Sequence, residues 1–166
     1  MEGIYFFGGR NQQEVITNKL FLLKIGKSKP VWVRPETTGI TPFPRYGHTM
    51  EYYQSMKILV IFGGRNEFNS FKDKSYCSNE IAILKISDNL TWLNLSVYGQ
   101  LPEPRYSHCS AFLSSQLLIF GGISEINYCN ASVWALEFDL KEISKEIEEE
   151  NSKKASIMKK SRSVLK

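Results

Sequence analysis

Three short apolar runs, each ending at a pair of glycines, dominate the pattern of hydrophobic and polar positions along the chain. The runs and their glycines are Ile4 to Phe7 with Gly8 and Gly9, Leu59 to Phe62 with Gly63 and Gly64, and Leu117 to Phe120 with Gly121 and Gly122. An uninterrupted apolar run of this kind is typical of a buried strand. Two glycines allow positive φ angles and let a neighbouring backbone come close. Because the first glycines are spaced by 55 and 58 residues, the pattern predicts a repeat architecture.

A second set of residues recurs at a constant spacing. Trp32 and Trp92 are 60 residues apart, and so are Pro-Arg-Tyr-Gly-His at 44–48 and Pro-Arg-Tyr-Ser-His at 104–108. In both copies a glycine follows the tryptophan by seven residues, and a proline follows that glycine by three. Residues of several types therefore recur at the same spacing in both copies, which supports a repeat architecture.

The apolar segments predict about ten strands in all. They are residues 4–7, 20–25, 31–34, 46–53, 57–62, 81–86, 91–97 and 133–138, with a strand–turn–strand pair from Tyr106 to Phe120. Four antiparallel strands make one blade of a β-propeller, and a ring needs at least four blades. The chain alone is therefore expected to leave open sheet edges and an exposed inner face. A fragment of a longer chain, a propeller completed by another copy or subunit, and a truncated gene model are the alternatives, and we favour the first two.

With these motifs the chain resembles the kelch repeat, in the variant whose blades begin Pro-Arg-Tyr-Gly/Ser-His, over roughly residues 1–140. The resemblance implies an all-β fold, a partial kelch-type β-propeller of about two and a half four-stranded blades. The expected parts are a partial blade at 1–39, a full blade at 40–99, a partial blade at 100–140 and a charged, helical or disordered C-terminal tail at 141–166.

The tail differs in composition from the strands that precede it. Asp139 and Glu142 are spaced as in a helix capping box, and acidic residues precede basic ones, which suits the helix dipole. Ile143 and Ile147 begin a loose heptad that charged residues interrupt further on. A solvated helix or a disordered tail is therefore favoured over a coiled coil.

Charge and composition narrow the functional classes. The net charge is +4, of which residues 1–140 carry only +1, so the globular part lacks the basic balance of a nucleic-acid footprint. The sequence shows no apolar run long enough for a membrane span and no recognisable secretory leader. We therefore expect a cytoplasmic protein, with cytoskeletal association and the nucleus left open. Cys77, Cys109 and Cys129 lack metal-ligand spacing, so they are interpreted as free thiols, and no metal or cofactor is expected.

The repeated residues are interpreted first as structural. The glycine pairs would end the inner strands where blades crowd together, and Trp32 and Trp92 would anchor the packing of blades. In the kelch family that the chain resembles, these positions belong to the core. His48 and His108 begin a strand, where an imidazole can bond the neighbouring backbone, and this role is favoured over catalysis or metal binding.

Two regions are candidate partner-binding sites. Arg45 and Arg105 lie in the expected loops between blades, where they would either bond loop carbonyls or recognise an acidic partner. The segment 66–79 and its flank mix aromatic and positive residues, as interface hot spots do, with a disordered insertion as the alternative. The residues concerned are Arg65, Phe68, Phe71, Lys72, Lys74 and Tyr76.

The predicted function is non-catalytic protein binding or scaffolding through propeller loops, as the resemblance implies. One alternative is a structural subunit that completes the propeller of a larger assembly, cytoskeletal assemblies included. Another is an enzyme fragment of a galactose-oxidase-like or other kelch type. The copper set of tyrosine and histidine with a Tyr–Cys pair, the iron run Glu-x-x-x-Asp-x-x-x-His and the common hydrolase and phosphate-loop motifs do not occur in the sequence.

Overall fold

The structure is a computed structural model. It describes residues 3–26, 29–66, 77–93, 97–124 and 133–139, together with residues 141, 143–145, 147–149 and 152. Most of the predicted loop 66–79, including Phe68, Phe71, Lys72, Lys74 and Tyr76, lies outside the described residues, as do Cys129 and the end of the tail.

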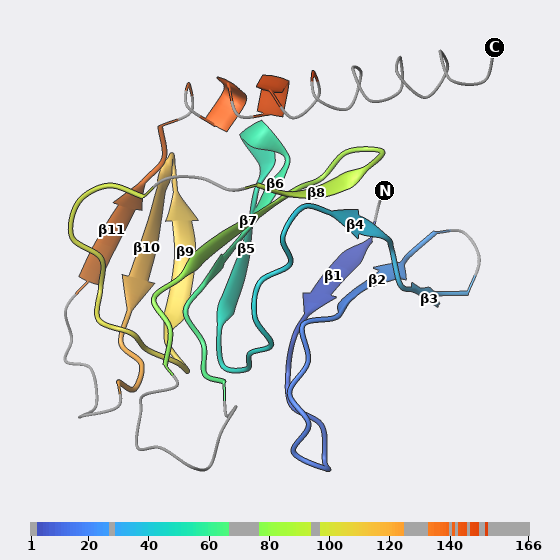
Figure 1. Cartoon of the computed structure of the whole chain (residues 1–166), viewed down its shortest axis with the longest axis horizontal. Helices are drawn as coiled ribbons and strands as arrows, with labels where there is room; N and C mark the ends of the chain where they lie inside the picture. The colour runs from blue at the N-terminus through green and yellow to red at the C-terminus, as the bar shows by residue number, and fades with distance from the viewer. Residues whose placement is uncertain are drawn as a thin grey trace, which may run out of the picture.

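The described residues form three sheets that stand side by side (Figure 1). The first sheet has the order β1-β2-β3, the central sheet β4-β8-β7-β6-β5, and the third sheet β11-β10-β9. The strands are β1 (Ile4–Phe7), β2 (Leu20–Lys24), β3 (Val31–Val33), β4 (Thr37–Thr38), β5 (Thr49–Tyr53), β6 (Ile58–Phe62), β7 (Ile81–Lys85), β8 (Leu90–Leu93), β9 (Cys109–Leu113), β10 (Gln116–Phe120) and β11 (Val133–Glu137). The all-β partial propeller is thus confirmed, and its ten predicted strands are all present in the described chain, together with the two-residue β4.

Corresponding strands occupy corresponding places in the three sheets. The apolar runs before the glycine pairs are β1, β6 and β10, and each pairs antiparallel with the strand that follows it. The first strand of a blade is β5 in the central sheet and β9 in the third. Among the described residues, the first sheet has no counterpart of β5, and the third sheet has none of β8. In the described parts of the chain, four antiparallel strands are therefore complete only in the central sheet.

Two apolar clusters hold the sheets together. The first joins Phe7 and Leu20 of the first sheet to Leu59, Leu84 and Trp92 of the central sheet. The second cluster lies between the central and third sheets. It includes Ile58, Val60, Phe62, Ile83, Leu117 and Ile119. Because β6 contributes to both clusters, all five of its residues are buried. Burial of each such side chain stabilises the fold by about 1.5–3 kcal/mol.

The beginning of the tail is helical at residues 141, 143–145, 147–149 and 152. The Asp139 carboxylate accepts a hydrogen bond from the Lys141 amide at 2.9 Å, as the predicted N-cap requires. The expected helix is therefore present and its described residues are mostly exposed, but Ile143, only 3% exposed, departs from the expectation of a solvated helix. Its side chain packs into the second cluster, and the partly buried Ile147 packs against that cluster. In the described part of the chain, none of the helical segments is long and apolar enough to cross a membrane.

Candidate protein-interaction site

The glycine pairs mark the end of the sheets where neighbouring repeats join. Gly8 and Gly63 both have a φ of 68°, which favours glycine. A Cβ atom on Gly8 would lie 2.6 Å from the Arg45 carbonyl oxygen, and one on Gly63 would lie 2.7 Å from that of Arg105. The first glycine of the first two pairs thus makes room for the backbone of the next sheet.

Arg45 and Arg105 connect adjacent repeats through their backbone and brace their own repeat through their side chains. Each backbone carbonyl accepts a hydrogen bond from the preceding repeat, from Gly9 at 2.8 Å for Arg45 and from Gly64 at 2.9 Å for Arg105. Each guanidinium donates to a carbonyl of its own repeat. The acceptors are Phe43 and Gly63 for Arg45 at 3.1 and 3.0 Å, and Glu103 and Gly121 for Arg105 at 3.1 and 2.9 Å. Of the two roles predicted for these arginines, the geometry favours the bonding of loop carbonyls.

Both arginine side chains are buried, which argues against a role in recognising a partner at the surface. Arg45 is 2% exposed and Arg105 is 3% exposed, so neither fork is presented to a partner in this structure. Arg45 also bonds the carboxylate of Glu80, which lies just before β7. The position that precedes β11 in the third repeat is Ser132, outside the described residues. Within the described part of the chain, Arg105 has no carboxylate as a salt-bridge partner.

His48 and His108 pack their rings against the phenylalanine that ends the preceding apolar run. The ring of His48 lies 5.7 Å from that of Phe7, and the ring of His108 lies 5.2 Å from that of Phe62, both edge-on. The Nε2 atom of His108 also hydrogen-bonds the Thr49 hydroxyl at 2.9 Å. Burial, helped by the nearby arginines, lowers the pKa of both histidines to about 4. Both rings are therefore neutral near pH 7.

The two repeated tryptophans have different surroundings. Trp92 is 4% exposed and meets the Phe7 ring edge-on at 5.2 Å, so it packs between two sheets. Trp32 is 59% exposed and touches Phe6 of its own sheet at a ring distance of 5.0 Å. The expectation of a blade-packing anchor therefore fits Trp92 but not Trp32, because no described sheet covers that side of the first sheet.

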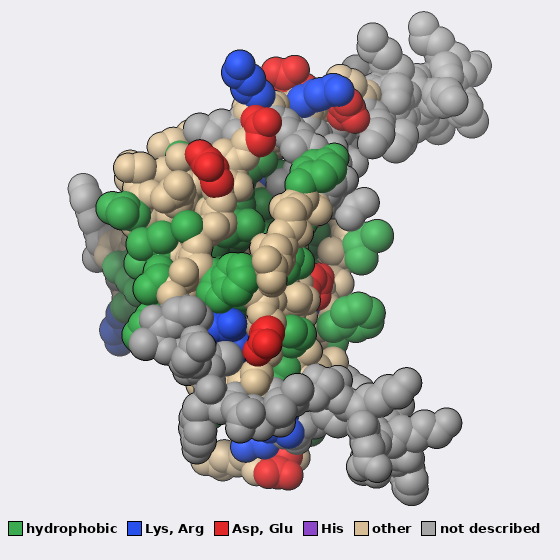
Figure 2. All heavy atoms as spheres, turned by 90° about the vertical axis from the view of Figure 1, so that its left-hand side faces the viewer, with side chains coloured by type: hydrophobic (Ala, Val, Ile, Leu, Met, Phe, Trp, Pro, Cys, Tyr) green, Lys and Arg blue, Asp and Glu red, His purple; other side chains and the backbone are tan. Residues whose placement is uncertain are grey.

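Several exposed apolar residues lie on the outer sheets, at positions whose counterparts in the central sheet are buried. On the first sheet Phe6 and Trp32 are exposed, whereas the corresponding Ile61 and Trp92 of the central sheet are buried. On the third sheet Phe120 is exposed, whereas the corresponding Phe62 is buried. Figure 2 faces the third sheet and shows hydrophobic side chains gathered over it. Gly121 shares the φ of 68° with Gly8 and Gly63, yet a Cβ atom there would meet nothing within 4 Å.

Alternating arginine and tyrosine side chains cross the three sheets at the glycine-pair end. The guanidinium of Arg10 lies 4.9 Å from the centre of the Tyr46 ring, and that of Arg65 lies 5.3 Å from the centre of the Tyr106 ring. The two tyrosine rings are 6.4 Å apart, and Arg65 donates to the Tyr106 hydroxyl at 3.4 Å. Arg10 is exposed and the other three are partly buried. We call these four residues the Arg–Tyr strip.

Backbone hydrogen bonds hold three residues of the strip in position. Tyr46 and Arg65 exchange two backbone hydrogen bonds, of 3.0 and 2.8 Å. The same pair of bonds joins Tyr106 to Ile123, which stands where the earlier repeats have arginine. The strip lies at the opposite end of the sheets from the helical start of the tail (Figure 1).

Of the strip, only Arg65 was a candidate from the sequence. Arg10, Tyr46 and Tyr106 were missed, although two regularities could have indicated them. Arginine follows the glycine pair in two repeats, at Arg10 and Arg65, and tyrosine follows Pro-Arg in two repeats, at Tyr46 and Tyr106. The contact between them could not be predicted because it joins one repeat to the next.

The order of the sheets and the glycine–arginine junctions between them define a segment of a β-propeller. The chain belongs to the kelch-repeat family, since the model of the KLHDC2/KLHL20/DRC7 Kelch-repeats domain matches residues 2–162. Domains of this family are generally protein-interaction modules without a catalytic role.

Three relatives illustrate the range of proteins that contain a similar segment. The chain is 35% identical over 122 residues to the Rho GTPase-activating protein gacHH of Dictyostelium discoideum, covering 74% of this chain and 8% of that protein. It is 31% identical over 120 residues to dynein regulatory complex subunit 7 of Chlamydomonas reinhardtii, covering 72% and 10%. It is 28% identical over 127 residues to the Rab9 effector protein with kelch motifs of Bos taurus, covering 75% and 31%. The chain thus spans between 8% and 31% of these relatives' lengths.

Proposed function

We propose that the chain is a non-catalytic protein-binding module of a cytoplasmic protein, and that its partner contacts the glycine-pair end. The observation that carries this proposal is the Arg–Tyr strip, which runs across all three sheets. The names of two relatives, a Rab9 effector and a dynein regulatory complex subunit, agree with a role in protein assemblies. The expected interface changes accordingly, because it uses Arg65 but not the buried Arg45 and Arg105.

Arginine and tyrosine suit a protein interface. Both residue types are enriched among interface hot spots, since they combine a large contact area with directional hydrogen bonds. The Arg65 guanidinium already stacks on the Tyr106 ring, so less of its side-chain freedom remains to be lost on binding. The predicted contribution of Phe68, Phe71, Lys72 and Tyr76, which follow Arg65 in sequence, remains part of this proposal.

The test is quantitative affinity purification of the tagged full-length protein from its own cells. Arg65→Ala and Tyr106→Ala should each deplete the same co-purifying proteins. Arg34→Ala, which changes an exposed arginine after β3, should deplete none. Circular dichroism on each variant checks folding. If the bound proteins are unchanged in both strip variants, the glycine-pair end is not the interface.

A second candidate function is supported by the two exposed apolar faces. We propose as the alternative that these faces pack against further blades, so that the chain is a structural part of a larger propeller. Phe120 and Trp32 occupy positions whose counterparts in the central sheet are buried, and Gly121 leaves space where another repeat places an arginine carbonyl.

The solution mass of the purified chain tests this alternative. Light scattering should show association that Trp32→Asp and Phe120→Asp each reduce. Ile40→Asp is the control, because Ile40 is 84% exposed and lies in the connection after β4. A stable monomer with a cooperative melt would contradict the alternative.

A further inference from the structure

We propose that the open edge of β1 binds an extended strand of a partner protein, antiparallel to β1, with an aromatic side chain of that strand stacked on Tyr52. This site is separate from the Arg–Tyr strip, so the inference goes beyond the proposed function and can fail without it. It is carried by a comparison of two junctions. The first junction lies between the first and central sheets, and the second lies between the central and third sheets, where β5 provides the template for the added strand.

The edge of β1 that faces away from β2 pairs with no described strand. Backbone groups alternate between the two sides of an antiparallel strand. The Gly8 amide donates to the Lys19 carbonyl at 3.1 Å, so the N–H and C=O groups of Tyr5 point toward the open edge. In the central sheet the corresponding Val60 is paired with Glu51 of β5. Tyr5 can therefore form the same ladder bonds with an added strand.

A cavity lies beside this edge, between the first and central sheets. It has a volume of about 480 Å³, and Tyr5, Met50, Tyr52 and Leu59 are among the residues that line it. Tyr52 is 50% exposed. The Tyr5 hydroxyl is buried and has no hydrogen-bond partner among the described residues. The cavity is therefore large enough for an aromatic side chain and has a polar group that a tyrosine of the added strand can approach.

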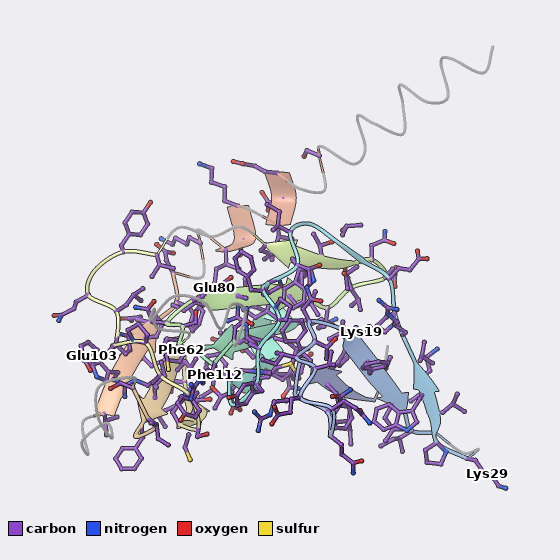
Figure 3. The ribbon with its side chains drawn as sticks, turned by 60° about the horizontal axis from the view of Figure 1, so that its bottom comes forward. Lys19, Lys29, Phe62, Glu80, Glu103 and Phe112 are labelled. Atoms are coloured by element: carbon purple, nitrogen blue, oxygen red, sulfur yellow. The ribbon has the colours of Figure 1, made fainter. Side chains whose placement is uncertain are left out.

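The second junction shows which side chain occupies the corresponding place between the central and third sheets. Tyr53, the last residue of β5, stacks on Phe112 at a ring distance of 4.8 Å. Figure 3 labels Phe112 and Phe62, which lie close together where these two sheets meet. Phe112 occupies the same position in the repeat as Tyr52. Because the first sheet has no described counterpart of β5, Tyr52 carries no such ring, and an added strand can supply it.

A hydroxyl residue begins the sequence predicted for the added strand. At the second junction the Thr49 hydroxyl and Nε2 of His108 are 2.9 Å apart. His48 corresponds to His108, and among the described residues no hydroxyl bonds its ring. Thr49 lies opposite Phe62, which corresponds to Phe7 in the first sheet. A threonine or serine opposite Phe7 would therefore reach His48.

An apolar residue is expected in the middle of the added strand. At the second junction Glu51 accepts a hydrogen bond from the Ser110 hydroxyl at 3.0 Å, and Met50 takes the place of Ser110 at the first junction. A thioether has no hydrogen to donate, so apolar contact replaces this bond. The added strand thus reads threonine or serine, any residue, apolar, any residue, aromatic. It runs antiparallel to β1, from a place opposite Phe7 to one opposite Gly3.

Fluorescence anisotropy with a labelled synthetic peptide tests the inference. The core of the peptide is Thr-Lys-Val-Lys-Tyr. Three control peptides replace the tyrosine with serine, replace the threonine with valine, or carry a methyl group on the amide nitrogen of the central valine. The full-length protein should bind the parent peptide, and it should bind each control about two- to tenfold more weakly, because each control loses one stacked ring or one hydrogen bond.

A variant of the protein identifies the site. Tyr52→Ala removes the ring on which the tyrosine of the peptide stacks and should weaken binding of the parent peptide about two- to tenfold. The same variant should leave binding of the serine control within about twofold, because that peptide has no ring to stack. Tyr98→Ala is the matched control, since Tyr98 is 77% exposed and does not line the cavity. Circular dichroism on both variants checks folding.

Three results would overturn the proposal. They are a parent peptide that does not bind, equal binding of the parent and the methylated peptide, and an affinity for the parent peptide that Tyr52→Ala leaves unchanged. The first result would mean that the edge of β1 is not open to a partner in the full-length protein. In each case, partners lost from Arg65→Ala in affinity purification would still support the proposed function at the glycine-pair end.

Discussion

Gly63 and Gly121 share a φ of 68° but differ in what surrounds them. Gly63→Ala adds a methyl group 2.7 Å from the Arg105 carbonyl oxygen, so the junction must move apart. We expect a loss of about 2–4 kcal/mol in unfolding free energy for Gly63→Ala. Gly121→Ala meets open space and should cost only about 1 kcal/mol, the price of the left-handed backbone. Urea denaturation measures both, and equal losses would refute the role of the junction.

The histidines predict a pH dependence of stability. His48 and His108 have a pKa of about 4 in the folded chain, below the ordinary value of 6.5. A depressed pKa means that the unfolded chain binds protons first, so stability is full above about pH 6.5 and falls as the pH drops toward 4. Urea midpoints should therefore be lower at pH 5 than at pH 7.

The control for this pH dependence is the double variant His48→Gln, His108→Gln. It removes both titrating rings, and glutamine can still hydrogen-bond the Thr49 hydroxyl that His108 contacts. The fall in midpoint between pH 7 and pH 5 should become smaller than in the unaltered chain. If the urea midpoint falls equally in both proteins, the pH dependence of stability comes from other titratable groups.

Comparing Trp92 with Trp32 measures how much a neighbouring sheet contributes to the free energy of unfolding. Trp92→Ala removes a side chain that is 4% exposed and packed on Phe7, and should cost about 3–5 kcal/mol. Trp32→Ala removes one that is 59% exposed and should cost less than about 1 kcal/mol. Thermal or urea denaturation compares them, and a similar cost for both would show that Trp32 is buried in solution.

At the scale of single residues, the repeat register predicted which positions are equivalent but not their surroundings. Trp32 and Trp92 have the same spacing to the next glycine and prolines, yet only one is buried. Likewise, Arg45 and Arg105 were predicted to lie between repeats, but their carbonyls accept hydrogen bonds from Gly9 and Gly64 of the preceding repeat, which no pattern within one repeat reveals. Burial of a junction residue depends on two repeats, so a pattern within one repeat cannot predict it.

At the scale of elements, Ile143 is the buried residue by which the described helical start of the tail packs against the sheets. Ile143→Asp places a charge in the second cluster, where the side chain is now 3% exposed. We expect the helical residues to detach while the strands remain folded, because the sheets are held by other residues of that cluster. Hydrogen exchange should accelerate at residues 143–149 only.

Lys145→Asp is the control for this detachment. Its side chain is 77% exposed, so a new charge there should leave exchange in the helix nearly unchanged. Acceleration throughout the third sheet in Ile143→Asp would instead show that the helical segment supports the fold of that sheet.

Strands and the helix cap were predictable as elements, but the docking of the helix was not. The apolar runs and glycine pairs located the strands, and Asp139 located the helix start, because these depend on local sequence. Ile143 contacts residues of the central and third sheets that lie far away in sequence. The two-residue β4 was also missed, since a pair of threonines gives no periodicity.

At the scale of the whole molecule, the free energy of local unfolding should be highest in the central sheet. β6 is buried at every position because sheets cover both of its faces, whereas β1 and β11 each have exposed residues. Amide exchange in the purified chain should therefore be slowest in β6 and faster in β1 and β11. Uniform protection across the three sheets would indicate that the outer faces are covered in solution.

The junctions between sheets make their sequence directional. The junction between the first and central sheets joins the phenylalanine face of one to the tryptophan face of the next, as Phe7 and Trp92 show, and Phe62 of the central sheet likewise packs in the cluster shared with the third sheet. The array therefore has a leading end at Phe120 and a trailing end at Trp32, and the two ends are chemically different. A polypeptide that presents only one of these faces would pack on one end of the array and block further sheets there. The other end would still be able to bind another sheet.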